Sequence, residues 1–388
     1  MRIELPISKS IANRLLILQA IHGDGLLTVS DTLPEDVRIM SEAIRLLGER
    51  REARIDLGNC GTAMRFLTAY CAQLEGQTII LDGVERMRHR PIGQLVDALR
   101  EIGADIEYLG EEGFPPLRIM GKALDKSKPI TLNHPQSTQF VSALLLIGAN
   151  VQTNSTSPYI TLTKEMIWNK EQGTKNKDKL LTTDQTQVTN LGSLLLAPYS
   201  EIERDWSSAA FWYEYVALYG GEITLPGLFR DSLQGDKVVA DIFAHLGVHT
   251  EYTPEGIILS PIAYSETSNS PLSGRPIAAQ AASRSKILIQ DFGTCPDLYP
   301  AVALTCERLG IELHAKGTES LPIKESDRLR AVREHRTDHD HRMAMALLIA
   351  GCEVDDTACI SKSYPQFMEE YHELFPQTPC SHRTITAQ

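Results

Sequence analysis

A short stretch near the start of the chain, LPISKSIANR, brings hydroxyl groups and cations to the beginning of one helix. Ser8 or Ser10 is a suitable N-cap for the apolar run 11–21, which predicts that helix. Lys9 lies at the helix start, and Arg14 follows Ser10 by four residues on the same face. Free N–H groups at a helix N-terminus attract anions, and an ammonium and a guanidinium strengthen the attraction. The stretch predicts an anion site or, equally, a capped surface helix with two solvated cations.

Two further stretches place arginines at helix starts. In GNCGTAMRF, Gly61 allows a ligand close to the backbone, Thr62 opens an apolar helix, and Arg65 lies one turn into it. In RMRHRPI, Arg90 adjoins a helix that we expect to begin with Pro91. An anion at such a place gains from both the guanidinium and the helix dipole. A glycine turn and a solvated basic turn are the plain structural interpretations of the two stretches.

Later parts of the chain add hydroxyls, acids and cations. The stretches PQSTQFVS and DWSSAA predict capped helix starts, for which an ordinary structural cap is the simpler interpretation. The C-terminal third contributes Asp297, Lys324, Glu325, Arg328, Arg342 and Lys362. Exposed ion pairs within the run 324–328 would contribute little to stability. His339 and His341 alternate with acids, but no third ligand has the usual spacing, so the sequence does not favour a metal site.

Composition limits the classes of protein to which the chain belongs. Its 388 residues exceed one ordinary core and favour two domains, and 42% hydrophobic with 23% charged residues is typical of a globular protein. A net charge of −12 argues against nucleic-acid binding, and no apolar run is long enough to cross a membrane. Seven cysteines without a Cys-x-x-Cys pair favour reduced thiols. We expect a cytoplasmic protein without a signal peptide.

A sequence pattern recurs between the motifs. It consists of a helix with apolar periodicity, a glycine that ends the helix, and a short strand. The glycines expected to end helices are Gly48, Gly103, Gly247 and Gly310. Strands are expected at 105–108 and 248–252, and a related helix-glycine-strand phrase at 23–29 and 220–225. Because one unit that mixes helices and strands recurs, the sequence predicts an α/β (α+β) architecture.

Three segments depart from this repeat. The polar segment 169–190 and the serine-rich segment 265–285 have no useful periodicity and predict loops. After the helix expected at 329–334, a glycine stop and a strand pair should follow. Instead the chain passes directly into DHRMAMA, which begins at Asp340. We therefore expect one unit to be truncated after Arg328.

Taken together, the motifs resemble those of the 5-enolpyruvylshikimate-3-phosphate synthase family. The matches occur in the family's order over nearly the whole chain, which makes the resemblance specific. They are SKS with Asn13 and Arg14, GN with GTAMR at 58–65, RM with RPI at 86–92, QF with SAL at 139–144, PYI at 158–160, QGD at 234–236, PD at 296–297, KESDR at 324–328, DHRMAMA at 340–346, and Lys362 with Pro365.

The resemblance implies two similar domains, each built from three βαβαββ units, with an active-site cleft between them. The continuous domain would span residues 7–202, and the discontinuous domain residues 1–6 plus 203–388, with crossings near Pro6 and Glu203. The implied enzyme needs no metal or organic cofactor. It transfers the enolpyruvyl group of phosphoenolpyruvate to the 5-hydroxyl of shikimate 3-phosphate and releases phosphate. This reaction belongs to the shikimate pathway, which leads to chorismate and the aromatic amino acids.

The resemblance also implies roles for residues at matching positions. Phosphoenolpyruvate would be held by Lys9, Gly61, Arg90, Gln139, Arg328, Arg342 and Lys362. Shikimate 3-phosphate would be held by Ser10, Arg14, Ser137, Thr138, Gln139, Thr156, Asp297 and Lys324, with Tyr159 packed beside it. Reaction is addition and then elimination, with Asp297 as base and Lys9 and Glu325 as proton-transfer partners. The residue types leave open whether Lys9 or Glu325 protonates the methylene carbon.

The chain departs from the family pattern at several positions, which suggests altered affinity. Ile7 replaces glycine, Cys60 replaces alanine, Thr138 and Thr156 replace serines, and Ser320 replaces an asparagine.

Two alternatives stay open. One is a UDP-N-acetylglucosamine enolpyruvyl transferase, which has the same fold and chemistry; Lys9-Ser10 and the run 324–328 fit the shikimate enzyme better. The other is a catalytically impaired relative with a binding role, against which the intact Lys9, Asp297, Glu325 and Lys362 argue. We expect a monomer that binds small-molecule substrates, with neither a nucleic-acid nor a membrane partner.

Overall fold

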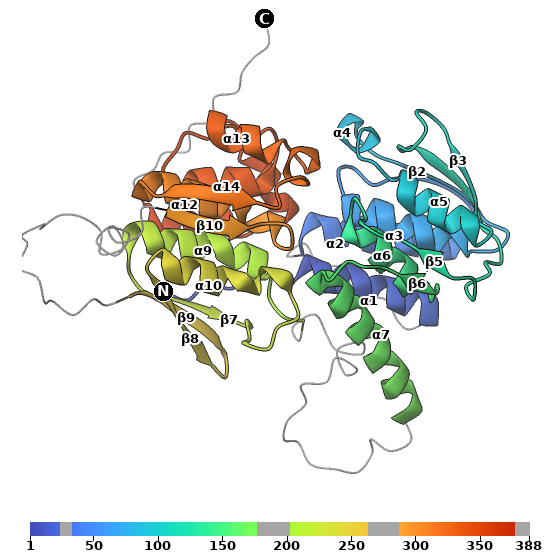
Figure 1. The fold of residues 1–388 in the computed structure, drawn as a ribbon, viewed down its shortest axis with the longest axis horizontal. Helices are drawn as coiled ribbons and strands as arrows, with labels where there is room; N and C mark the ends of the chain where they lie inside the picture. Colours follow the sequence, from blue (N-terminus) through green and yellow to red (C-terminus); the bar gives the residue numbers. More distant parts are fainter. Residues whose placement is uncertain (24–32, 177–201, 263–286, 377–388) are drawn as a thin grey trace, which may run out of the picture.

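The described part of the chain forms two lobes, each with its own hydrophobic core (Figure 1). The N-lobe is the group of residues around the core that runs from Ile7 to Ile202. The C-lobe is the group around the core that joins Ile3 and Leu5 to buried residues from Trp206 to Tyr371. The computed structural model describes residues 1–23, 33–176, 202–262 and 287–376.

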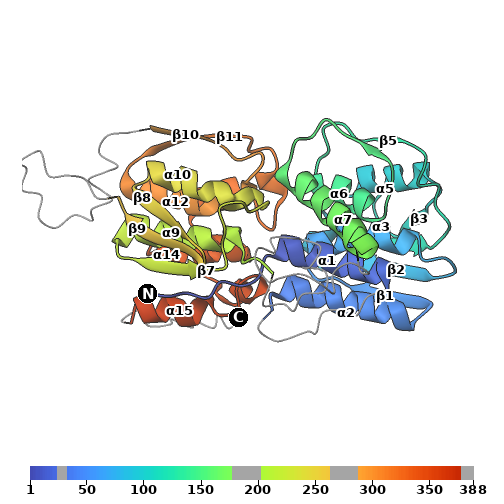
Figure 2. The same cartoon turned by 90° about the horizontal axis from the view of Figure 1, so that it is seen from below.

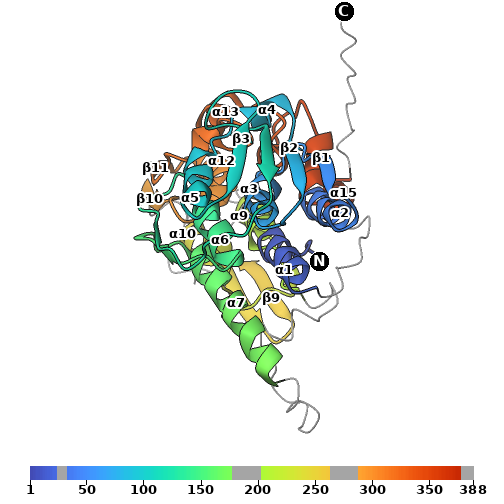
Figure 3. The same cartoon turned by 90° about the vertical axis from the view of Figure 1, so that its right-hand side faces the viewer.

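The N-lobe is built around α3, which contacts α1, α2, α5 and α6. Its larger sheet has the order β1-β2-β4-β3, with β1 and β2 parallel and β4 antiparallel to both of its neighbours. A second sheet is the short parallel pair β5 and β6. Helix α7 extends away from the lobe (Figure 3). The elements are α1 (Lys9–His22), α2 (Glu35–Glu49), β1 (Glu52–Asp56), α3 (Gly61–Ala72), β2 (Thr78–Asp82), α4 (Glu85–Arg88), α5 (Gly93–Glu101), β3 (Asp105–Tyr108), β4 (Leu117–Met120), β5 (Ile130–Thr131), α6 (Thr138–Leu146), β6 (Val151–Gln152) and α7 (Pro158–Asn176).

The C-lobe is built around α9, which is buried on nearly all sides because its residues are apolar all round. Helices α10, α12 and α14 pack on α9. Its sheets are the antiparallel β7-β9-β8 and the parallel pair β10-β11. The elements are α9 (Trp206–Tyr219), β7 (Ile223–Pro226), η2 (Gly235–Val238), α10 (Val239–His245), β8 (Val248–Thr253), β9 (Gly256–Pro261), β10 (Ile287–Asp291), η4 (Pro296–Leu298), α12 (Tyr299–Leu309), β11 (Glu312–Lys316), η5 (Leu321–Ile323), α13 (Arg328–Glu334), α14 (His341–Ile349), η6 (Ala358–Lys362) and α15 (Phe367–Leu374).

The chain passes between the lobes at two places that lie side by side. The N-terminal segment runs along the C-lobe beside β7, where Arg2 forms a parallel bridge with Thr224, and then enters α1 (Figure 2). At the crossing, Ile7 forms an antiparallel bridge with Arg204. The N–H of Ser8 donates to the carbonyl of Glu203 at 2.9 Å. The two connections between the lobes are therefore hydrogen-bonded to each other.

Most of the predicted strands and helix ends are found in the structure. Strands β3 and β8 occupy the predicted segments, and β7 lies in the predicted segment 220–225. Gly103, Gly247 and Gly310 have positive φ and follow helices, as expected. Gly48 is an exception, since α2 continues through it to Glu49 and the residue keeps a helical conformation.

Two other expectations are wrong, and one lies outside the described residues. Helix α5 begins at Gly93 and not at Pro91, because Pro91 and Ile92 complete the turn after α4. Part of the expected loop 169–190 is helical, because α7 continues to Asn176. The rest of that loop, the loop at 265–285 and most of the segment 23–29 lie outside the described residues. No helix in the described ranges is long and apolar enough to cross a membrane.

The connection between α13 and α14 contains no strand. Three residues in it, His335, Asp338 and His339, have positive φ, which is uncommon for residues other than glycine. Thr337 ties the turn to the following segment, because its N–H and its hydroxyl both donate to Oδ1 of Asp355, at 3.2 and 2.6 Å. The turn thus takes α13 directly into α14, and β11 has β10 as its one strand partner among the described residues.

Candidate active site

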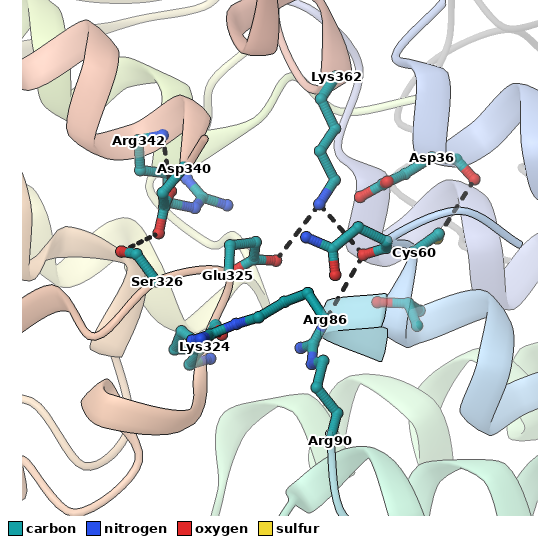
Figure 4. A network of polar contacts seen from close by, with 12 residues as sticks. Asp36, Cys60, Arg86, Arg90, Lys324, Glu325, Ser326, Asp340, Arg342 and Lys362 are labelled. Atoms are coloured by element: carbon teal, nitrogen blue, oxygen red, sulfur yellow. Dashed lines mark hydrogen bonds and ion pairs between the residues drawn. The ribbon is translucent and has the colours of Figure 1, made fainter. Parts of the chain in front are cut away.

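A cavity of about 530 Å³ lies between the lobes and is lined by residues of both. Predicted site residues that line it are Lys9, Ser10, Arg14, Gly61, Arg90, Ser137, Thr138, Gln139, Tyr159, Asp297, Lys324, Glu325 and Arg342. They come from helix starts and turns of both lobes, so the site exists only where the two lobes pack against each other. Figure 4 shows part of the polar network at the cavity, including Asp36, Arg90, Lys324, Glu325 and Arg342 of its wall.

The N-lobe wall is built around Gly61, the first residue of α3. A Cβ at this position would lie 2.6 Å from one guanidinium nitrogen of Arg65 and 2.6 Å from one of Arg90. The missing side chain therefore lets two cations approach the helix start together. Arg65 donates to Oε1 of Gln139 at 2.9 Å, and Gln139 donates to the Thr62 hydroxyl at 2.9 Å. Burial, followed by the charge of Arg90, lowers the pKa of Arg65 to about 9.

Helix α1 contributes Lys9 and Arg14 to the same wall. The Lys9 ammonium forms an ion pair with Asp36 at 3.1 Å. Arg14 is buried, and its guanidinium donates to the hydroxyls of Thr163 and Ser142 at 2.8 and 3.1 Å. Burial lowers the pKa of Arg14 to about 10. Arg14 is thus held rigidly by α6 and α7, whereas Lys9 is held by α2.

The C-lobe wall brings two carboxylates together around the fully buried Arg328. Asp297 contacts Arg328 at 2.7 Å and Arg342 at 3.0 Å, and Glu325 contacts Arg328 at 3.1 Å. Lys324 lies 3.6 Å from Asp297, and burial lowers its pKa. Because two carboxylates and three cations contact one another here, each carboxylate is held in a fixed orientation beside the cavity.

These contacts decide the ionisation of the two carboxylates. Burial opposes ionisation of Asp297, but the charges of Arg342, Lys324 and Arg328 outweigh it and hold its pKa well below the usual value. For Glu325, burial is likewise outweighed by Lys362, Arg90 and Arg328, and its pKa is also well below the usual value. In this arrangement both acids are carboxylates at neutral pH.

A third carboxyl nearby behaves in the opposite way. Asp236 is fully buried, and burial followed by the negative charge of Asp297 raises its pKa to about 7. Its Oδ2 accepts a hydrogen bond from the Ser207 hydroxyl. Two acids whose surroundings separate their pKa values in this way provide one ionised and one protonated group at the same pH.

The start of α14 adds a cation and a histidine. The Asp340 carboxylate caps the helix by accepting from the N–H of Arg342 at 2.9 Å, and its other oxygen contacts Arg328 at 2.8 Å. His341 is buried at the cavity wall, and neither ring nitrogen has a hydrogen-bond partner among the described residues. Burial, followed by the charges of Lys9 and Arg342, holds the pKa of His341 well below its ordinary value. The imidazole is therefore neutral.

Two hydrogen bonds join the lobes beside the cavity (Figure 4). The Lys362 ammonium of the C-lobe donates to the carbonyl of Asn59 at 3.2 Å and lies 3.7 Å from Glu325. The Arg86 guanidinium of the N-lobe donates to the carbonyl of Lys324 at 3.0 Å. The lobes are thus in contact beside Lys324 and Glu325.

Several buried donors at the cavity lack a partner among the described residues. Nε of Arg90 and Nη1 of Arg342 are buried without an acceptor. Buried donors are costly unless they are satisfied, so their presence at a polar cavity favours a ligand that accepts hydrogen bonds. Anionic oxygens fit this requirement and also compensate the charge.

Three predicted residues do not line the cavity. Arg328 lies behind the two carboxylates that it positions, and Lys362 lies at the junction of the lobes. Thr156 is exposed, and its neighbour Ser157 lines the cavity instead. Ser320, where the family has asparagine, does line it.

The residues of the wall that the predicted substrate-binding set leaves out include Asp36, Arg65 and His341. Arg65 and His341 stand inside motifs that were recognised, and their positions at helix starts were the available signal. Asp36 lies in no such motif, and its role follows from its contact with Lys9.

The chain is similar to known proteins over most of its length. A family model described as EPSP synthase (3-phosphoshikimate 1-carboxyvinyltransferase) matches residues 49–335 and 333–371. The 3-phosphoshikimate 1-carboxyvinyltransferase of Bacteroides fragilis strain YCH46 is 38% identical over 416 residues, which cover 95% of this chain and 93% of the relative. The 3-phosphoshikimate 1-carboxyvinyltransferase of Colwellia psychrerythraea is 28% identical over 421 residues, which cover 95% of this chain and 96% of the relative.

The fold has solved counterparts as well. An EPSP synthase structure from Acinetobacter baumannii aligns with a TM-score of 0.60 at 18% identity, covering 96% of this chain and 95% of that chain. At this identity the likeness concerns the mixed α/β fold. The family model and the Bacteroides relative, both of which extend over most of the chain, show that it belongs to the EPSP synthase (3-phosphoshikimate 1-carboxyvinyltransferase) family.

Proposed function

We propose that the cavity between the lobes is the active site of an enolpyruvyl transferase. The chain transfers the enolpyruvyl group of phosphoenolpyruvate to the 5-hydroxyl of shikimate 3-phosphate and releases phosphate, a step of the shikimate pathway. The observation that carries this conclusion is the meeting of cations from both lobes with Asp297 and Glu325 in one cavity. Two phosphates and two carboxylates can be accommodated only where such cations compensate their repulsion.

The two substrates divide the cavity between them. Phosphoenolpyruvate is assigned to the cations Lys9, Arg90, Arg342 and Lys362, with Gln139 beside Gly61 and with Arg328 holding the carboxylates behind. Shikimate 3-phosphate is assigned to the hydroxyls of Ser10, Ser137 and Thr138 and to Arg14, Asp297, Lys324 and Gln139, with Tyr159 beside it. Thr156 was expected in this second group; its exposure supports Ser157 as the hydroxyl in its place.

Asp297 is assigned as the base that removes the proton of the 5-hydroxyl. In the arrangement described above its pKa is held down by three cations, which makes it a weak base. Binding of phosphate and carboxylate groups to the same cations weakens their field at Asp297, and its pKa then rises toward a useful value. The second substrate thus activates the base.

The methylene carbon of phosphoenolpyruvate receives a proton in the addition step. Lys9 and Glu325 both line the cavity, which supports both as candidates for this transfer. Glu325 is ionised in the surroundings described above, so it has to gain a proton once anions screen Lys362 and Arg90. The tetrahedral intermediate then loses phosphate together with one proton of its new methyl group, which restores the carbon–carbon double bond, and closure of the lobes excludes water from the site.

The two lobes support the domain division 7–202 and 1–6 plus 203–388. Their separate cores and the paired crossing at Ile7 and Arg204 agree with these boundaries. The order β1-α3-β2-α4-α5-β3-β4, in which α4 is a single short turn of helix before α5, supports one βαβαββ unit of the three proposed in each domain. The strandless turn between α13 and α14 supports truncation of the unit that contains Arg328.

One assay tests the function against its alternatives. Release of inorganic phosphate is measured with phosphoenolpyruvate and either shikimate 3-phosphate or UDP-N-acetylglucosamine. We expect release with shikimate 3-phosphate alone. Release with the nucleotide sugar would identify the other transferase, and binding of both substrates without release would identify an impaired relative. We further propose a monomer of the cytoplasm, which sedimentation of the purified chain and fractionation of cells would check.

A further inference from the structure

Lys362 reaches the junction of the lobes from the end of η6, a helix of five residues. Its side chain is buried, and its ammonium donates to the carbonyl of Asn59 at 3.2 Å and lies 3.7 Å from Glu325. A lysine side chain has a flexible stem of four carbons, so the place of its ammonium depends on where its backbone is held. The contacts that hold η6 therefore affect how Lys362 meets a ligand.

Tyr364 anchors the end of η6 in the core of the C-lobe. The N–H groups of Ser363 and Tyr364 both donate to the carbonyl of Ile360, at 3.1 and 3.0 Å. Lys362 lies within this tight turn. The Tyr364 side chain is fully buried, and its ring stands edge-on to the ring of Trp212, with the centroids 6.4 Å apart. A displacement of Tyr364 would therefore displace Lys362 as well.

The hydroxyl of Tyr364 has two partners on other helices. It donates to Oε2 of Glu370 on α15, and it accepts from the indole N–H of Trp212 on α9 at 3.2 Å. Burial, followed by the charge of Glu370, raises the pKa of Tyr364 well above its usual value, so the hydroxyl keeps its proton and remains a donor. Burial also raises the pKa of Glu370 to about 7, and a backbone hydrogen bond from Glu4 holds the same carboxyl. The end of η6 is thus bonded to two helices.

These bonds lie behind the cavity wall, because neither Tyr364 nor Glu370 lines the cavity. We propose that Tyr364 and Glu370 are positioning residues for phosphoenolpyruvate, whose hydrogen bond sets the place of the Lys362 ammonium. The inference rests on the proposed function, in which Lys362 holds this substrate. The competing interpretation is that the bond only stabilises the core of the C-lobe.

Tyr364→Phe removes the hydroxyl and keeps the ring in its packing. Loss of the buried bond lets the end of η6 shift, so the KM of phosphoenolpyruvate should rise by about threefold to tenfold. This KM is measured by phosphate release at saturating shikimate 3-phosphate. The KM of shikimate 3-phosphate should keep its wild-type value, because Lys362 is not assigned to that substrate.

Variants of Glu370 test the same bond from its other end. Glu370→Leu removes the acceptor and should raise the KM of phosphoenolpyruvate as Tyr364→Phe does. Glu370→Gln keeps an oxygen that accepts from Tyr364 and should keep the wild-type KM. Because both residues act through one bond, Tyr364→Phe combined with Glu370→Leu should raise this KM no further than the stronger single variant. Independent, multiplying increases in the double variant would overturn the proposal, as would equal increases in the Leu and Gln variants.

Tyr213→Phe is the matched control. Tyr213 on α9 is also buried, and its hydroxyl forms a hydrogen bond with that of Thr250 on β8 at 2.9 Å. The control should lower the melting temperature, as Tyr364→Phe does, and leave both KM values unchanged. If the Tyr364 bond only stabilised the core, Tyr364→Phe would behave like this control, and that result would overturn the inference.

The outcomes separate this inference from the function on which it rests. Wild-type protein that releases no phosphate would refute the proposed function, and the inference with it. Wild-type release combined with an unchanged KM of phosphoenolpyruvate in Tyr364→Phe and Glu370→Leu would refute the inference alone. Should Tyr364→Phe fail to fold, the difference between Glu370→Leu and Glu370→Gln still decides.

Discussion

At the scale of single residues, the site works through carboxylates whose charges are set by neighbouring cations. Asp297 touches three cationic side chains, and its ionised form is therefore strongly favoured. A group held in this way keeps its orientation in the absence of substrate, and it becomes a better base only when anions arrive. In the mechanism that we propose, substrate binding therefore also activates the base.

Replacement of Asp297 by asparagine should abolish turnover while leaving the fold intact. The amide keeps the shape but cannot accept the 5-hydroxyl proton, so phosphate release should fall by about a hundredfold or more. Asp241→Asn, which changes an exposed carboxylate on α10, is the control and should be fully active. Near-normal release by the Asp297 variant would remove this residue from the mechanism.

Another buried acid, Glu214, lies outside the cavity wall. Glu214 on α9 is fully buried, and neither carboxyl oxygen has a hydrogen-bond partner among the described residues. Burial raises its pKa well above the usual value. The core tolerates the neutral carboxyl better than the ionised one. The stability that Glu214 contributes in its neutral form is therefore complete below the pKa that this carboxyl has in the unfolded chain. That contribution is lost as the pH rises through the folded pKa.

Glu214→Met should therefore stabilise the protein, and more so at pH 8 than at pH 5. The substitution keeps the volume and removes a buried polar group, which costs about 1–3 kcal/mol when it is unpaired. Chemical unfolding at the two pH values measures the difference. Equal effects at pH 5 and pH 8 would mean that Glu214 is not the group that titrates.

At the scale of elements, the start of α3 decides how closely cations approach the substrate. Gly61 is needed there because the space of its missing side chain is taken by Arg65 and Arg90. The crowding atoms are ends of flexible side chains, so a Cβ would displace the guanidinium groups and leave the helix in place.

Gly61→Ala should weaken phosphoenolpyruvate binding by about tenfold or more, the loss expected when a charged hydrogen bond is misplaced. The melting temperature should change little. Gly48→Ala on α2 is the matched control, because nothing lies within 4 Å of its added Cβ. That variant should gain about 1 kcal/mol of stability from helix propensity and keep its affinity. Unchanged affinity in Gly61→Ala would show that the two arginines do not hold this substrate.

At the scale of the whole molecule, the lobes meet through contacts outside the cavity wall. Arg86 is exposed on the short helix α4 and reaches the carbonyl of Lys324 at 3.0 Å. This bond fixes the backbone between Lys324 and Glu325 when the lobes are together. It thereby links closure to the placement of two site residues.

Arg86→Ala should raise the KM of both substrates by about threefold to tenfold, because the closed arrangement loses one charged hydrogen bond. The melting temperature should not change, since Arg86 is exposed. Arg45→Ala on α2 removes the same charge from the N-lobe surface, where Arg45 pairs with Glu42 and Glu49. Equal KM values in the two variants would show that the cross-lobe bond has no part in binding.

Local signals in the sequence located many elements of this fold. Ser137 and Asp340 cap α6 and α14 as their positions predict, because a cap depends on residues two or three apart. Glycines 103, 247 and 310 follow helices because positive φ is a property of one residue. Gly48 was expected to end a helix and Pro91 to begin one, but α2 continues to Glu49 and α5 begins at Gly93. At these two positions the surrounding structure overrides the local preference of the residue.

The sequence by itself determined the kind of chemistry, because the ordered motifs specify the charged groups and their family. Only the tertiary structure decided which of these groups touch. Arg328 serves the site from behind Asp297 and Glu325, and Lys9 depends on Asp36, which no motif contains. Ser8 lost its expected capping role to Gln234, which lies 226 residues away. Contacts between distant segments depend on how the two lobes fold and pack against each other. The spacing of residues within a motif does not specify these contacts.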